Sequence, residues 1–169
     1  MDLCMKFPSQ RQLYLLGFIA TCLMLGVIAY LQAFEGFTPC PLCILQRFVL
    51  ALLGSVFFLG ALIKLKKTSG TLIGLTACLI SGLGVFLAGR QVWLQRFPSP
   101  DHTDCGASLE YMLHAFPLRE VLNNVLKGSA ECTQVSWQFL NLSLADWSLL
   151  GFIALLILSF AQLCQAQAR

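Results

Sequence analysis

The sequence predicts an all-α membrane protein, a bundle of four transmembrane helices with two loops on the outer side of the membrane. Only 11% of its 169 residues are charged, whereas about a quarter of a typical soluble domain is charged. Four segments carry no charge, and each reaches the ~20 residues that a helix needs to cross the hydrocarbon core, the second of them, Phe48 to Ile63, if Ile44 to Arg47 form its opening turn. Backbone polar groups are satisfied in lipid only within helices or closed barrels, and these runs are too long and too uniformly apolar for barrel strands.

The four spans follow one another within a single membrane domain. We expect them at about 13–34, 44–63, 68–89 and 147–166 of a domain that covers residues 1–169. The first span is expected to be retained, since no small-residue cleavage site closes it. Pro39 and Pro41 stop the first helix and constrain the turn that leads into the second, because proline fixes φ and lacks a backbone donor. The motif Phe97-Pro98-Ser99-Pro100 breaks any helix that continues beyond the third span, and Trp147 opens the fourth.

The distribution of charge predicts the orientation. One side of the predicted bundle holds six of the basic residues and a single acid: Lys6, Arg11, Lys64, Lys66, Lys67 and Arg169, with Asp2. Cytoplasmic loops carry an excess of lysine and arginine, so both termini are expected in the cytoplasm. The loops at about 35–43 and 90–146 then face outward. Because this topology accounts for the net charge of +3, no nucleic-acid partner is expected.

The eight cysteines divide between the two sides of the membrane. Four are expected to pack as small hydrophobic residues within the helices or at their cytoplasmic ends: Cys4, Cys22, Cys78 and Cys164. The other four fall on the outer side: Cys40 and Cys43 in the first loop, and Cys105 and Cys132 in the second. An oxidising compartment makes disulfides the expected state of these outer cysteines.

Three interpretations of the outer cysteines remain open. A C-x-x-C ring such as Cys40-Pro41-Leu42-Cys43 is typically labile and catalytic, which favours a relay of two exchangeable disulfides. Both pairs could instead be structural, since a disulfide that closes a longer loop contributes about 3 kcal/mol. Four sulfur ligands could also bind zinc, although an oxidising compartment disfavours free thiolates. The relay is the favoured interpretation, with no metal.

Arg47 follows Cys43 by four residues and therefore lies one helical turn further along the same face. A guanidinium stabilises a nearby thiolate and can donate to a carbonyl oxygen of a bound cofactor. Gln46 is interpreted as an ordinary polar residue of the membrane interface. No nucleotide, flavin or haem motif is present, so the expected electron acceptor at the edge of the bilayer is a membrane-soluble quinone.

The second outer loop is expected to contain a short amphipathic surface helix. Leu118, Val121, Leu122 and Val125 repeat at the helical spacing i, i+3, i+4 and i+7. Such a helix can lie flat on the membrane or pack against the four-helix core, and both arrangements remain open.

These features together resemble the DsbB family of bacterial disulfide bond formation proteins over nearly the whole chain. The resemblance rests on the four spans, the early C-x-x-C, Arg47, Gln95 before Phe97-Pro98-Ser99-Pro100, Cys105, and Cys132 followed by Trp137-x-Phe139-Leu140-x-Leu142 and Trp147.

The resemblance implies a mechanism. A reduced periplasmic thioredoxin-fold oxidant, DsbA, attacks the disulfide between Cys105 and Cys132 and forms a mixed disulfide with Cys105. Cys132 then attacks Cys40, and Cys43 is released as a thiolate that passes its electrons to quinone, with Arg47 stabilising the charge and the bound quinone. The implied location is the bacterial inner membrane, where the partners are a DsbA-like protein, the quinone pool and the lipid bilayer.

Arg47, Gln91 and Gln95 are the quinone-binding residues that the resemblance implies. Gln91 stands where the family often has a histidine, which is a departure from its pattern. Ubiquinone is expected ahead of menaquinone. The alternatives are a quinone-coupled thiol oxidase of the vitamin K epoxide reductase type and a non-enzymatic four-helix protein stapled by disulfides.

Overall fold

The computed structural model describes residues 9–34, 40–63, 67–97, 114, 117, 119–121 and 138–167. The described elements are α1 (Gln10–Phe34), α2 (Pro41–Leu62), α3 (Lys67–Arg96), the two strands β1 (Gln138–Phe139) and β2 (Leu142–Ser143), and α7 (Leu144–Gln167). By length and composition, α1, α2, α3 and α7 are each able to cross a membrane. The predicted fold class, an all-α bundle of four membrane-spanning helices, is therefore confirmed.

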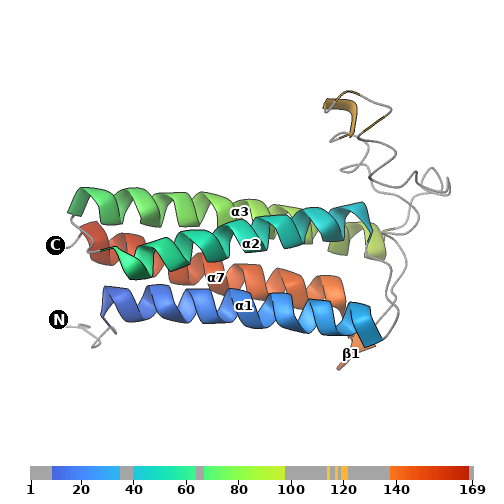
Figure 1. Cartoon of the computed structure of the whole chain (residues 1–169). Helices are drawn as coiled ribbons and strands as arrows, with labels where there is room; N and C mark the ends of the chain where they lie inside the picture. The colour runs from blue at the N-terminus through green and yellow to red at the C-terminus, as the bar shows by residue number, and fades with distance from the viewer. Residues whose placement is uncertain are drawn as a thin grey trace, which may run out of the picture.

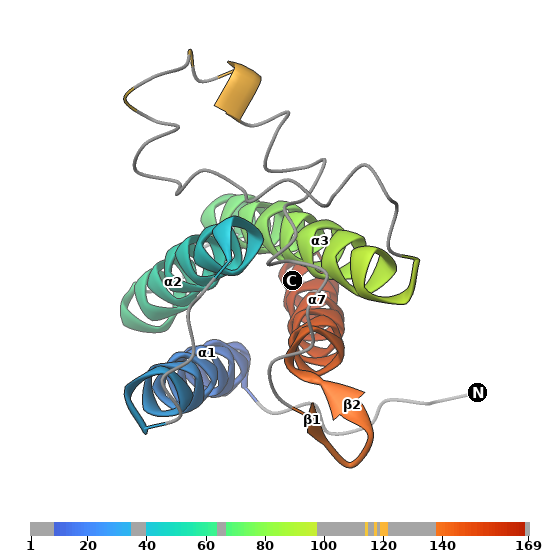
Figure 2. The same cartoon turned by 90° about the vertical axis from the view of Figure 1, so that its right-hand side faces the viewer.

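The four helices run alongside one another and surround a common axis (Figures 1 and 2). Their order around this axis is α1, α2, α3 and α7, and α3 and α7 are in the most extensive contact. α1 begins and α7 ends at the same end of the bundle (Figure 1). The hairpin of β1 and β2 lies at the other end, where α2 begins, beside the start of α7.

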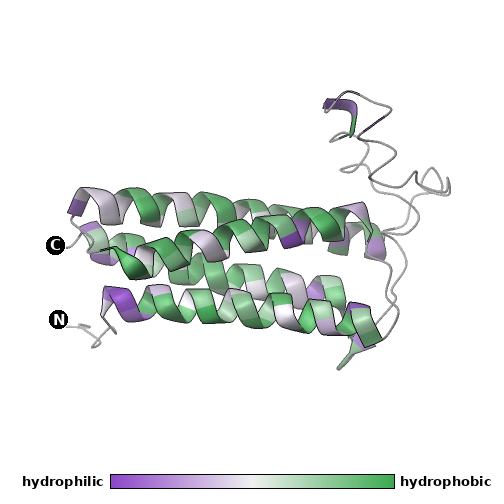
Figure 3. Cartoon of the chain, in the orientation of Figure 1, coloured by the Kyte–Doolittle hydropathy of each residue, from purple (hydrophilic) through white to green (hydrophobic). Residues whose placement is uncertain are grey.

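The helices are hydrophobic along most of their length, and hydrophilic residues gather mainly toward the two ends of the bundle (Figure 3). Leu23, Phe48, Leu79 and Phe160 are between 62% and 67% exposed. Side chains of this kind on every face of a bundle are typical of a protein whose solvent is lipid.

Small residues let the helices approach closely. A Cβ atom added at Gly84 of α3 would lie 2.2 Å from the ring of Phe152 on α7, and one at Gly17 of α1 would lie 2.9 Å from the ring of Phe57 on α2. Both phenylalanines are at most 1% exposed. Membrane helices associate through such packing of large side chains on glycine, since lipid offers little hydrophobic driving force between them.

The hairpin before α7 is closed by a two-residue turn. Leu140 and Asn141 have φ values of 54° and 60°, the left-handed conformation that tight hairpin turns require. Phe139 pairs with Leu142, and the indole N–H of Trp147 donates to the carbonyl oxygen of Phe139 at 3.3 Å. The hairpin is therefore attached to the first turn of α7.

The predicted amphipathic helix of the second outer loop is described only in part. Arg119, Glu120 and Val121 are helical, and Val121 is 3% exposed within the buried apolar cluster. This position therefore packs against protein. The other apolar positions of the predicted helix, Leu118, Leu122 and Val125, lie outside the described residues.

Candidate active site

The two cysteines of the C-P-L-C motif lie at the N-terminus of α2. Cys40 is the N-cap residue, and Pro41 occupies the first turn, where a missing backbone donor is tolerated. The backbone N–H of Cys43 donates to Cys40 Sγ at 3.4 Å, and the two sulfur atoms are 2.9 Å apart. Cys40 is only 3% exposed, and Cys43 is half-buried. The N-terminus of a helix favours negative charge, so this location favours a thiolate on the pair.

Arg47 points into the same space as Cys43. Both residues line a narrow recess of about 20 Å³. Arg47 Nη1 donates a hydrogen bond to Oε1 of Gln32 on α1. Its other terminal nitrogen, Nη2, is buried and has no hydrogen-bond partner among the described residues. This cationic donor is therefore available to a molecule that enters the recess.

Gln91 reaches the cysteines from α3, because this helix continues beyond the predicted end of its span to Arg96. Its Nε2 atom lies 3.1 Å from Cys43 Sγ and 3.8 Å from Cys40 Sγ. Gln46 Nε2 in turn donates to Gln91 Oε1 at 2.6 Å, and each glutamine is 6% exposed. Two buried amides thus connect α2 to α3 directly beside the sulfur atoms.

A larger apolar groove of about 570 Å³ adjoins the recess between α1 and α7. Leu23 and Val27 line it and are 64% and 56% exposed, so the groove faces the surroundings of the bundle. Met24, Ile28 and Ser148 line both the groove and the recess, together with Leu144. The arrangement is therefore an apolar groove on the outside of the bundle that adjoins a recess lined by the Arg47 cation and the Cys43 sulfur.

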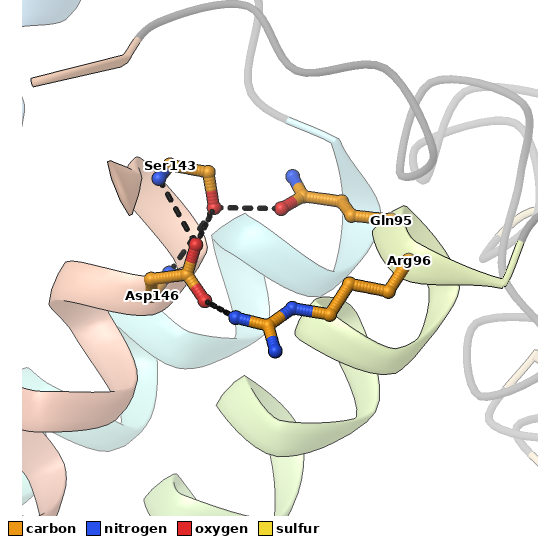
Figure 4. Close-up of polar contacts among 4 residues, drawn as sticks. All are labelled: Gln95, Arg96, Ser143 and Asp146. Atoms are coloured by element: carbon orange, nitrogen blue, oxygen red, sulfur yellow. Dashed lines mark hydrogen bonds and ion pairs between the residues drawn. The ribbon is translucent and has the colours of Figure 1, made fainter. Parts of the chain in front are cut away.

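Gln95 lies in a separate polar cluster at the end of α3 (Figure 4). Ser143 Oγ lies 2.8 Å from both Gln95 Oε1 and Asp146 Oδ2. The Asp146 carboxylate accepts from the backbone N–H of Ser143 and pairs with Arg96 at 3.1 Å, while the backbone N–H of Asp146 donates to Ser143 Oγ. Ser143 and Asp146 form a capping box at the start of α7. In this structure Gln95 therefore joins the end of α3 to that cap.

The second predicted cysteine pair, Cys105 and Cys132, lies outside the described residues. Within the described part of the chain, no group of three or more histidine, cysteine or acidic residues is arranged to hold a metal ion. The structure therefore brings together Cys40, Cys43, Arg47 and Gln91 of the predicted site residues.

Two residues of this site were not singled out from the sequence. Gln46 was interpreted as an ordinary interfacial residue, although its spacing of three residues from Cys43 places both on one helical face. Gln32 contacts Arg47 from α1, fifteen residues away in the sequence, and no pattern indicated this contact.

The chain is similar to known proteins over most of its length. The family model described as "Disulfide bond formation protein DsbB" matches residues 10–162. Disulfide bond formation protein B of Chromohalobacter salexigens is 43% identical over 156 residues, which are 92% of this chain and 91% of that protein. The protein of the same name from Nitrosococcus oceani is 39% identical over 155 residues, 92% of each chain. That of Stutzerimonas stutzeri is 38% identical over 159 residues, 94% of this chain and 98% of the relative.

Proposed function

The chain belongs to the DsbB family of disulfide bond formation proteins, and from this premise we propose that it reoxidises a periplasmic DsbA-like thiol oxidase and transfers the electrons to membrane quinone. Family membership and the four membrane helices make it a multi-pass membrane oxidoreductase that forms disulfides. The dithiol partner and the quinone are the two substrates of the proposed reaction.

The observation that carries the proposal is the position of Cys43 between the buried Cys40 and a recess that adjoins an apolar groove. Its sulfur lies 2.9 Å from that of Cys40, and its side chain lines the recess that adjoins the groove. Electrons that reach Cys40 can therefore leave through Cys43 toward a molecule dissolved in the bilayer. A structural staple would need neither the recess nor a cationic donor beside it.

The electron balance of the proposed reaction closes without a further redox reagent. A thiolate of the reduced partner attacks the disulfide between Cys105 and Cys132, and Cys132 is released from Cys105. Cys132 then attacks Cys40 of the disulfide between Cys40 and Cys43, which releases Cys43 as a thiolate. The second partner thiol resolves the mixed disulfide on Cys105, and the freed Cys105 attacks Cys132, which re-forms their disulfide and releases Cys40. Cys40 and Cys43 then return to a disulfide, so that two electrons and two protons pass in total from the partner dithiol to quinone, which becomes quinol. The steps at Cys105 and Cys132 follow the family resemblance.

The residues of the recess and groove fit a quinone. The apolar groove of about 570 Å³ suits an isoprenoid tail, and the unpartnered Nη2 of Arg47 is a donor for a quinone carbonyl. A quinone ring needs more room than the 20 Å³ of the recess. The proposal therefore requires Met24 and Ile28, which lie between groove and recess, to shift when the ring binds.

We also infer that the cysteine pair faces the periplasm and that both termini are cytoplasmic. α1 begins and α7 ends at the end of the bundle opposite the start of α2 (Figure 1). Lys67 opens α3 at that same end, which agrees with the excess of basic residues expected on the cytoplasmic side. An accessibility test with a membrane-impermeant thiol reagent on intact cells would examine this orientation.

The proposal is tested by quinone reduction with purified protein, a water-soluble ubiquinone analogue and a reduced thioredoxin-fold partner. Cys43→Ser is expected to abolish quinone reduction, because the last sulfur of the relay is lost. Cys22→Ala is the matched control, since Cys22 is exposed on α1 and does not line the recess. Quinone reduction that survived in Cys43→Ser would eliminate the relay and leave the non-enzymatic, disulfide-stapled alternative.

A further inference from the structure

Gln46 and Gln91 form a buried amide pair whose polarity is directed at the cysteines. Gln46 Nε2 donates to Gln91 Oε1 at 2.6 Å, and Gln91 Nε2 faces Cys43 Sγ at 3.1 Å. Both side chains are 6% exposed. Burying two amides within a membrane protein is costly unless they are hydrogen-bonded, so their mutual orientation is strongly determined.

An amide group has one accepting end and one donating end. Because the NH₂ group of Gln46 occupies the oxygen of Gln91, the NH₂ group of Gln91 must point the other way, toward the sulfur atoms. A thiolate sulfur only accepts hydrogen bonds, so it is stabilised by the donating end and destabilised by the oxygen. In the structure, Gln91 has the orientation that favours a thiolate, with its oxygen engaged by Gln46 and its NH₂ group on the Cys43 sulfur.

We propose that Gln46 is a positioning residue that acts through Gln91 to hold an NH₂ donor on the Cys43 sulfur. This inference rests on the proposed function, since that function makes Cys43 the thiolate that forms when electrons reach the pair. Gln46 itself does not touch the sulfur in this arrangement. It sets the direction of the group that does.

The donor supplied in this way does not titrate. The side chains that line the recess from α1 and α7 are Met24, Ile28, Leu144, Ala145, Ser148 and Phe152, none of which is ionisable in the physiological range. Arg47 is the charged group of the recess lining. Among the described residues, the Cys40 thiol at 2.9 Å is the titratable group beside the Cys43 sulfur, so the two thiols of the reduced protein titrate as a pair.

The experiment measures the thiolate of Cys43 directly, in the full-length, reduced protein without quinone. Iodoacetamide is added over a range of pH, and the alkylated fraction of Cys43 is read by tandem mass spectrometry, which distinguishes it from Cys40 in the same peptide. Gln46→Met and Gln91→Met are each expected to raise the pH midpoint of alkylation by about one unit, a tenfold loss of thiolate, because a hydrogen bond to a charged group is lost. Gln162→Met is the matched control, since Gln162 is fully buried on α7 and does not line the recess.

The double variant distinguishes positioning from a general packing effect. If Gln46 acts only through Gln91, Gln46→Met combined with Gln91→Met has the same midpoint as Gln91→Met alone. Additive shifts, or an unchanged midpoint in Gln46→Met, would overturn the proposal. Gln46→Asn, shorter by one methylene, supplies the same test in a milder form if the methionine variant does not fold. Because no quinone is present, failure here is distinguishable from failure of the proposed function, which is decided by quinone reduction in Cys43→Ser.

Discussion

Removing the Arg47 guanidinium should weaken quinone binding without weakening the fold. Nη2 is buried and has no partner among the described residues, so the substrate-free protein gains little from it. A quinone carbonyl would supply the missing acceptor, and a hydrogen bond to a charged group contributes about 1.5–3 kcal/mol. At about 1.4 kcal/mol for each factor of ten, Arg47→Met should raise the KM for quinone by about 10- to 150-fold.

The assay is steady-state reduction of a water-soluble quinone analogue at saturating reduced partner, with thermal unfolding followed in parallel. Gln32→Leu is the matched control, because it removes the acceptor of Arg47 Nη1 and keeps the cation. Gln32→Leu is expected to raise the KM for quinone less, by about two- to tenfold, because Gln32 is a neutral hydrogen-bond partner that only orients the Arg47 guanidinium. An unchanged KM in Arg47→Met would refute the assignment of Arg47 to the quinone site.

Two further predictions concern the groove and the start of α7. A Cβ atom at Gly151 would lie 2.3 Å from the terminal methyl group of Met24, so Gly151→Ala should push Met24 into the groove and raise the quinone KM about tenfold. Gly82→Ala, where the added Cβ meets nothing within 4 Å, should leave the KM unchanged, and equal values in both variants would contradict the predicted role of Met24. Ser143→Ala should lower the free energy of unfolding by about 1 kcal/mol through loss of the capping box, measured by thermal or denaturant unfolding in detergent. A stability equal to that of the unaltered protein would show that the cap contributes nothing.

The membrane-spanning helices were predictable because their signal is local. Long runs without charge cross lipid only as helices, and the described part of the chain has four helices of this kind. Their ends were less predictable. α3 continues to Arg96 because an interfacial helix tolerates polar residues such as Arg90 and Gln95 once it leaves the hydrocarbon core. This extension is what puts Gln91 and Gln95 on a helix.

Within the candidate site, the residues that share one helix could be related to each other from the sequence. Arg47 follows Cys43 by one turn of α2, and the structure places both in one recess. Contacts between helices could not be obtained in this way. Gln91 is 48 residues from Cys43, and its amide reaches the sulfur only because α2 and α3 pack with these faces together.

The sequence by itself determined that this protein is surrounded by lipid, how many of the described helices are able to cross a membrane, and that Cys40 and Cys43 form a C-x-x-C motif. Hydropathy, proline position and C-x-x-C spacing are all properties of neighbouring residues. The tertiary structure alone decided that Gln46 donates a hydrogen bond to Gln91, that Gln95 joins the cap of α7 through Ser143, and that an apolar groove between α1 and α7 adjoins the recess of Cys43. The physical reason is that these contacts depend on the rotation and separation of packed helices. Those quantities are set by the fit of many side chains, such as Phe152 on Gly84, and no single segment encodes them.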